Sequence, residues 1–172
     1  MTNEVNRMND LRPFAPSLMC MDIMDLRRQL QFFEDKAAYL HIDIMDGHFV
    51  RNLTLSPWFV SQIRPYTRSK LDVHLMVTNP YDYLPELIGL QADCVSPHIE
   101  TLLNYAFRFA FETKDAGLEL GMVLSPETEI PALYPVIEYV DKVTVMTVDP
   151  GFAGGRFIRG MLDKVQIGRA HV

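Results

Sequence analysis

Two histidines and one carboxylate are the residues of this chain best able to do chemistry. His41 and Asp43 are two positions apart in one apolar run, and His74 lies in another. Successive side chains of a strand point to opposite faces, so His41 and Asp43 share a face. Imidazole and carboxylate groups are costly to bury unless they are paired, hydrogen-bonded or bound to a metal. The trio predicts a site for one divalent metal ion (Zn, Fe, Co or Mn). The alternative is a hydrogen-bonded polar cluster.

A glycine-rich loop and a serine are candidate substrate contacts. Residues 150–155 (PGFAGG) follow one apolar run and precede an amphipathic segment at 157–165. Glycines let a backbone approach a phosphate, and a following helix N-terminus favours the anion. The alternative is an ordinary turn between strand and helix. Ser17 can hydrogen-bond a substrate hydroxyl, or it can cap the turn in which it lies.

These groups indicate a class of reaction. A metal beside a carboxylate, with a phosphate anchor, is typical of proton abstraction next to the carbonyl of a sugar phosphate. The metal would stabilise the enediolate, and Asp43 would act as the base. Epimerisation also needs a second acid on the opposite face of the substrate. None of the predicted strands offers an obvious second carboxylate.

Strand-like and helix-like segments alternate along the chain. The predicted strands are 14–19, 39–45, 71–77, 94–98, 118–124 and 141–148. Helices are predicted after Asp22, over 58–65, after Asn79-Pro80, over 102–114, after Ser125-Pro126 and over 157–165. Such alternation is the signature of a parallel sheet.

Two architectures compete for this pattern. An open doubly wound sheet is covered by helices on both faces. In a (β/α)8 barrel, alternate side chains point inward and ligands bind at the carboxyl-terminal mouth. Polar residues recur at strand ends, at Ser17, His41, Asp43, His74 and His98, which favours the barrel. The predicted fold class is therefore an α/β (β/α)8 TIM barrel, truncated to about six β/α units because a complete barrel has eight.

Composition and net charge limit the classes of protein to which this chain can belong. The 172 residues are 48% hydrophobic and carry a net charge of -6, which fits one globular domain. The charge argues against nucleic-acid partners and against an anionic membrane surface. Cys20 and Cys94 are predicted to be buried free thiols of a reducing compartment. The expected location is cytoplasmic, since no apolar run approaches membrane-spanning length.

Five motifs together resemble the ribulose-phosphate 3-epimerase family over residues 13–166. They are PSLM at 16–19, HIDIMDGHFV at 41–50, DVHLMV at 72–77, HIE at 98–100 and MTVDPGF at 146–152. The resemblance implies His41, Asp43 and His74 as metal ligands, with Asp43 also an acid/base. It implies substrate binding by Ser17, His74, Gly151, Phe152, Ala153 and Gly154, and a methionine cap formed by Met45, Met76 and Met146.

The resemblance also implies the substrate and a catalytic residue that is missing from this chain. NLTLSP at 52–57 and MTVDPGFAG at 146–154 look closest to D-allulose-6-phosphate 3-epimerase, which converts D-allulose 6-phosphate to D-fructose 6-phosphate. The alternative substrate is D-ribulose 5-phosphate of the pentose phosphate pathway. Family members carry a second catalytic aspartate on strand seven. This chain is therefore expected to be an inactive fragment of a homo-oligomeric parent enzyme. An alternative of another class is a non-catalytic phosphate-binding barrel fragment.

The two ends of the chain are expected to lie outside this domain. Residues 1–12 are polar and are predicted to be a disordered extension. Residues 167–172 (IGRAHV) can be encoded by ATC GGA AGA GCA CAC GTC, the start of a common sequencing adapter, and are expected to be non-native.

Overall fold

Five parallel strands form the centre of the molecule in a computed structural model. The structure describes residues 14–102 and 104–170, with side chains described up to Gln166. The strands are β1 (Leu40–Met45), β2 (Leu71–Met76), β3 (Cys94–Pro97), β4 (Glu119–Leu124) and β5 (Lys142–Val145). Their order in the sheet is β1-β2-β3-β4-β5, the order of the chain. A doubly wound sheet reverses its order at a switch point, and this sheet does not. The described part of the chain is therefore a partial (β/α) barrel, as predicted.

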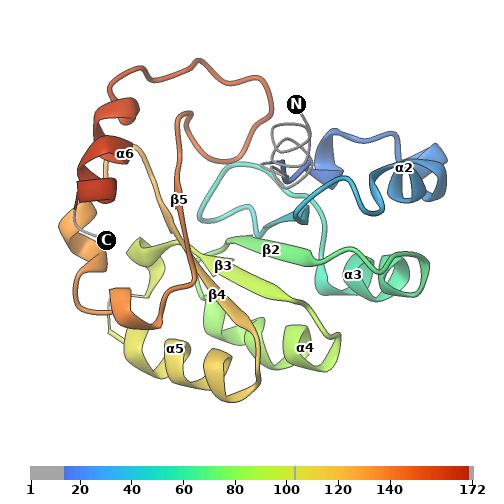
Figure 1. The fold of residues 1–172 in the computed structure, drawn as a ribbon, viewed down its shortest axis with the longest axis horizontal. Coiled ribbons are helices and arrows are strands. Elements are labelled where there is room, and N and C mark those ends of the chain that lie inside the picture. Colours follow the sequence, from blue (N-terminus) through green and yellow to red (C-terminus); the bar gives the residue numbers. More distant parts are fainter. Residues whose placement is uncertain (1–13, 103, 171–172) are drawn as a thin grey trace, which may run out of the picture.

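Helices connect the strands and cover the outside of the sheet. They are α2 (Leu26–Phe33), α3 (Pro57–Ile63), α4 (Leu84–Gly89), α5 (Ala106–Asp115) and α6 (Met161–Ala170). Short 3-10 helices lie at Leu18–Cys20, Ile23–Asp25, Arg64–Tyr66, Pro80–Asp82, Ile99–Thr101, Ile130–Leu133 and Ile137–Tyr139. Figure 1 shows α2, α3, α4, α5 and α6 following one another around the sheet in chain order, as helices do around a barrel.

The two faces of the sheet differ in chemistry because side chains alternate along each strand. Ile42, Val73, Val95 and Leu120 are fully buried in the main hydrophobic core, together with residues of the helices. The other face carries His41, Asp43, Asp72, His74 and Ser96. Strand register places Asp43 beside His74, and His74 beside Ser96. The alternation seen in the sequence thus produces an apolar outer layer and a polar interior.

Residues 14–19 do not form the predicted first strand. Their backbone contacts β1 through His41 N–H to Pro16 C=O (3.0 Å) and Ala38 N–H to Phe14 C=O (2.9 Å). Only Ser17 forms an isolated parallel bridge, to His41. The backbone then turns into a 3-10 helix at Leu18, whose N-cap is the Ser17 side chain. The segment occupies the place of a strand, but its turn comes too early for a ladder to form.

Three further predictions were wrong in detail. Ser125-Pro126 begins a turn rather than a helix, and the first helical residues after it are Ile130–Leu133. The last predicted strand, 141–148, is paired only over Lys142–Val145. Cys94 is buried as predicted, but Cys20 is exposed because it lies in the turn after Ser17. The predicted extension at 1–12 lies outside the described residues.

None of the helices in the described ranges combines the length and the apolar character that crossing a bilayer requires.

Candidate metal centre

Three potential ligand atoms from β1 and β2 form a small triangle. His41 Nε2 lies 3.4 Å from Asp43 Oδ1 and 3.3 Å from His74 Nδ1, and the third side, His74 Nδ1 to Asp43 Oδ1, is 3.2 Å. Asp43 and His74 are buried and His41 is partly exposed. Because the two strands are parallel and in register, residues far apart in the sequence project from the same layer of the barrel. The structure thus brings together the three residues that the sequence singled out.

The triangle has the dimensions of a metal site. Nitrogen and oxygen ligands bind Zn²⁺ at about 2.1 Å. Two atoms at that distance from one ion are about 3.0 Å apart at a right angle and about 3.4 Å apart at the tetrahedral angle. The three observed separations fall in this range, and two imidazoles with a carboxylate suit divalent transition metals. His41, Asp43 and His74 can therefore hold such an ion with further coordination positions open.

His74 is oriented by a chain of hydrogen bonds that leads away from the triangle. Its Nε2 lies 2.9 Å from Nε2 of His98, and His98 Nδ1 lies 3.2 Å from Glu100 Oε2. If His98 Nδ1–H donates to Glu100, then His98 Nε2 accepts from His74 Nε2–H. That arrangement leaves the lone pair of His74 on Nδ1, the atom that faces Asp43. His98 is fully buried, with its ring stacked on His74 and against Phe49.

Glu100 is anchored at the far end of this chain. Its carboxylate accepts hydrogen bonds from the Ser125 N–H (2.8 Å) and from the Thr128 hydroxyl. Burial by itself would raise the pKa of Glu100, but the bonds from His98 and Thr128 lower it to about 2. His98 and Glu100 thus orient His74 from outside the triangle.

The electrostatics of the triangle favour a positive charge at its centre. Burial lowers the pKa of His41, but its bonds to Asp43 and Asp72 outweigh burial and raise the pKa to about 9. Burial alone would raise the pKa of Asp43, yet bonds from His41, His74 and Ser17 bring it far below its usual range. For His74, burial dominates and lowers the pKa to about 4. The carboxylates of Asp43 and Asp72 thus stabilise a positive charge beside them. A proton on His41 supplies that charge, and a divalent cation would supply it in place of the proton.

Ser17 binds Asp43 directly. Its hydroxyl donates to Asp43 Oδ2 at 2.5 Å, while Oδ1 of the same carboxylate faces the two histidines. Ser17 Oγ also accepts from the Met19 N–H at 3.2 Å. The structure therefore combines the two roles that the sequence left open, since Ser17 caps a turn and also contacts the candidate site.

The glycine-rich loop has the backbone freedom predicted for it but is not next to a helix. Gly151 and Gly154 have φ values of 110° and 76°, which favour glycine. A Cβ at Gly151 would lie 2.9 Å from Val50, and Asn52 Nδ2 donates to the Gly151 C=O at 2.7 Å, so the loop packs on the segment after β1. Helix α6 begins only at Met161. Its N-terminus therefore does not directly follow the loop, contrary to the prediction.

Two of the three methionines expected above the site form a cluster there. Met45 and Met76 are buried at the ends of β1 and β2 and pack with Val50, Met19 and Phe49. Met146 is partly exposed and is not part of that cluster. Met45 and Met76 are paired two positions after Asp43 and His74, so this cluster lies one layer beyond the triangle on the same strand faces.

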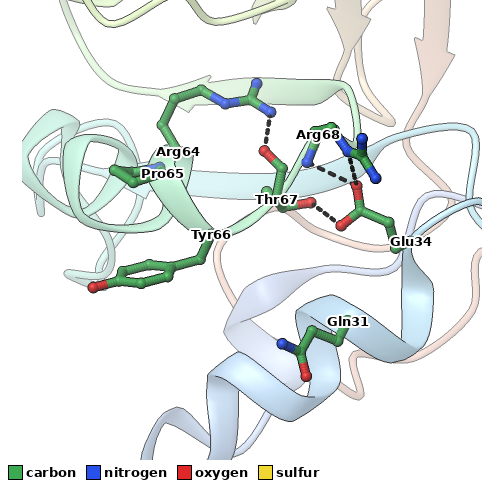
Figure 2. A pocket seen from close by; sticks show the side chains of 7 residues that line it. All are labelled: Gln31, Glu34, Arg64, Pro65, Tyr66, Thr67 and Arg68. Carbon is green, nitrogen blue, oxygen red and sulfur yellow. Dashed lines mark hydrogen bonds and ion pairs between the residues drawn. The ribbon is translucent and has the colours of Figure 1, made fainter.

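A cavity of about 570 Å³ lies elsewhere, between the ends of α2 and α3. In Figure 2 the carboxylate of Glu34 faces Thr67 and Arg68, and the guanidinium of Arg64 reaches the Thr67 carbonyl. Glu34, Arg64, Thr67 and Arg68 are thus bound to one another, and the cavity contains none of the residues of the triangle. It is not a candidate for the reaction that the sequence predicts.

Two residues next to the site, Asp72 and Lys142, were not identified from the sequence. Asp72 Oδ2 lies 2.7 Å from His41 Nδ1, and Lys142 Nζ forms an ion pair with the same carboxylate. Asp72 precedes His74 by two positions, so strand alternation could have placed it on the same face. Lys142 gave no such signal, because its side chain extends from β5 across the interior of the barrel to β2.

Comparisons with known proteins agree with this geometry. Residues 13–172 match the model of the ribulose-phosphate 3 epimerase family. The ribulose-phosphate 3-epimerase of Bacillus subtilis is 39% identical over 153 residues, which cover 88% of this chain and 70% of that protein. The ribulose-phosphate 3-epimerase of Treponema pallidum is 40% identical over 152 residues, covering 88% and 69%. The chloroplastic ribulose-5-phosphate-3-epimerase of Arabidopsis thaliana is 37% identical over 153 residues, covering 88% and 54%.

These relatives correct one expectation from the sequence. Their names do not support the D-allulose-6-phosphate specificity read from residues 52–57 and 146–154, and they favour the pentulose alternative. The family model spans nearly the whole chain, and the fold and the His-Asp-His triangle are those that the motifs predicted. This chain belongs to the ribulose-phosphate 3-epimerase family, whose members are isomerases that act on carbohydrates.

Proposed function

We propose that the chain derives from a metal-dependent 3-epimerase whose substrate is D-ribulose 5-phosphate. The observation that carries this proposal is the triangle of His41 Nε2, Asp43 Oδ1 and His74 Nδ1, with sides of 3.2 to 3.4 Å. The names of the relatives support the pentulose phosphate as substrate.

Asp43 is the residue proposed to move the proton at C3. Its Oδ1 faces the two histidines, which leaves Oδ2, held by the Ser17 hydroxyl, as the oxygen that can accept a proton from a substrate. Despite burial, the bonds from His41, His74 and Ser17 keep the pKa of this carboxyl group low, so it is ionised, as a general base must be before it accepts a proton. A divalent metal held by the triangle would supply positive charge to stabilise the anion that forms on the substrate.

The other residues proposed for the substrate come from the loops at the strand ends. Gly151, Phe152, Ala153 and Gly154 are proposed to bind the phosphate through backbone N–H groups, because two of these glycines adopt backbone conformations that open such a loop. Asn52 supports this loop through its bond to Gly151. Met45 and Met76 would exclude water from the reacting carbon.

Inversion at C3 needs a second acid on the opposite face. Within the ranges that the structure describes, Asp43 is the one carboxylate in the His-Asp-His group. We therefore expect this chain to perform the half of the reaction that Asp43 can perform alone, which is exchange of the C3 proton with solvent.

The test is deuterium incorporation at C3 of D-ribulose 5-phosphate in heavy water. The 172-residue chain would be assayed with added Zn²⁺, Fe²⁺, Co²⁺ or Mn²⁺, beside Asp43→Asn and with D-allulose 6-phosphate as a second substrate. Exchange that requires both metal and Asp43, and that is faster on the pentulose, supports the proposal. Substrate binding without any exchange would support a non-catalytic phosphate-binding role instead, and faster exchange on the hexulose would refute the substrate assignment.

A further inference from the structure

The carboxylate of Asp72, on β2, contacts one residue of the candidate metal centre, His41. Asp72 is almost fully buried, with 1% of the residue exposed. In the sheet, Asp72 is the register partner of His41. Its Oδ2 lies 2.7 Å from His41 Nδ1, on the side of the ring opposite to the nitrogen that faces Asp43 and His74. Asp72 therefore touches a candidate ligand without belonging to the triangle.

Two further side chains hold Asp72 in this position. The Ser96 hydroxyl donates to Oδ1 at 2.6 Å, and the Lys142 ammonium pairs with Oδ2. His41, Ser96 and Lys142 thus surround this buried carboxylate with polar partners, which a buried charge requires.

Gly121 of β4 provides the space for this arrangement. A Cβ at that position would lie 2.0 Å from Ser96 Oγ and 3.3 Å from Lys142 Cε. Any other residue would displace Ser96, the donor to Asp72 Oδ1, and would crowd Lys142. The arrangement therefore depends on residues from β2, β3, β4 and β5.

We propose that Asp72, held by Ser96 and Lys142, is a positioning residue that keeps a proton on His41 Nδ1 and directs the lone pair of His41 Nε2 to a divalent cation. A histidine whose second nitrogen donates to a carboxylate is fixed in ring orientation and is a stronger metal ligand. Removing such a partner typically weakens metal binding about 10- to 100-fold. This inference rests on the metal site proposed above.

The competing explanation is structural, because a buried Asp72–Lys142 pair also fills the barrel interior. Asp93 provides a control, since it is a partly exposed carboxylate that also pairs with a cation, Arg64, at 3.0 Å. It also accepts from a backbone N–H, that of Leu71, at 2.8 Å. The variants Asp72→Asn and Asp93→Asn therefore each lose an ion pair, and only the first loses a partner of His41.

The first experiment measures the Kd of Zn²⁺ and Mn²⁺ for the wild-type chain, Asp72→Asn, Asp93→Asn and His41→Gln, by competition with a chromophoric chelator. We expect about 10- to 100-fold weaker binding for Asp72→Asn and a change below about twofold for Asp93→Asn. Equal loss in both variants, or no loss in Asp72→Asn while His41→Gln abolishes binding, overturns the role of Asp72 and leaves the metal site standing. Absence of binding by the wild-type chain overturns both proposals.

The second experiment needs no variant and so does not depend on the folding of Asp72→Asn. Nitrogen-15 spectra of histidine-labelled wild-type chain loaded with Zn²⁺ report which ring nitrogen carries the proton. We expect His41 to keep a slowly exchanging proton on Nδ1 and to bind the ion through Nε2. Zinc on Nδ1, or an Nδ1 proton that exchanges as fast as that of an exposed histidine, overturns the proposal.

Discussion

Replacing Glu100 with glutamine measures what the carboxylate at the end of the His74–His98 chain contributes to stability. Glutamine has nearly the same shape and keeps an oxygen that can accept from the Ser125 N–H and the Thr128 hydroxyl. The substitution removes the negative charge that His98 Nδ1 faces at 3.2 Å. The difference between the two proteins therefore reports mainly the charge of Glu100.

The magnitude follows from the pKa of this carboxyl group. The pKa falls from its ordinary value of 4.5 to about 2, because the bonds from His98 and Thr128 outweigh burial. At about 1.4 kcal/mol per unit of pKa, the lowered pKa corresponds to about 3 kcal/mol of stability at pH 7. The side chain is 24% exposed, and solvent screening reduces the expected effect to about 2 kcal/mol.

The pH dependence has a definite sign. A group whose pKa is lower in the folded state stabilises the protein above its unfolded pKa, and this contribution is lost as the pH falls toward the folded pKa. For Glu100 the window runs from 4.5 down to about 2. Glu100→Gln should therefore be less stable than the wild-type chain at pH 7, and the gap should narrow below pH 4.5.

Urea unfolding at pH 7, 4.5 and 3 tests this expectation. The exposed Glu86 on α4 supplies the control variant Glu86→Gln, which should match the wild-type chain within about 0.5 kcal/mol. The reasoning is refuted if Glu100→Gln also stays within that limit at pH 7. It is equally refuted if the loss at pH 3 is as large as the loss at pH 7, because the effect would then not come from the charge.

Three further predictions concern the interior and the metal. Gly121→Ala should cost at least about 1–3 kcal/mol in urea unfolding, because the added Cβ would lie 2.0 Å from Ser96 Oγ, whereas Gly89→Ala, with no atom within 4 Å of the added Cβ, should cost nothing; equal effects would contradict the packing argument. Ser17→Ala should cost about 1.5–3 kcal/mol because its hydroxyl donates to the ionised Asp43, and a loss as small as that of Ser61→Ala on the surface would contradict this. Zn²⁺ at 100 times its Kd should raise the free energy of unfolding by about 2.7 kcal/mol, EDTA should reverse this, and His41→Gln should show no rise; a rise in that variant would place the ion elsewhere.

The alternation of strands and helices, and the face on which the key residues lie, could be predicted from the sequence alone. Apolar and polar residues alternate through residues 39–45 and 71–77, and a strand turns that alternation into two faces. The triangle of His41, Asp43 and His74 follows once the two strands are parallel and in register, as the βαβ pattern predicts. Motif similarity then indicated the family, although it pointed to the hexulose rather than the pentulose phosphate.

Which elements pair, and which side chains meet across the barrel, depends on the three-dimensional arrangement of the strands. Residues 14–19 look like a strand, yet Ser17 turns the backbone into a 3-10 helix and its hydroxyl reaches Asp43. Lys142 meets Asp72 across 70 positions of sequence because β5 lies three strands from β2 on a curved sheet. Local periodicity reports the direction of a side chain but not the distance to a residue on another strand. That distance depends on the curvature of the whole sheet and on the space that Gly121 leaves open.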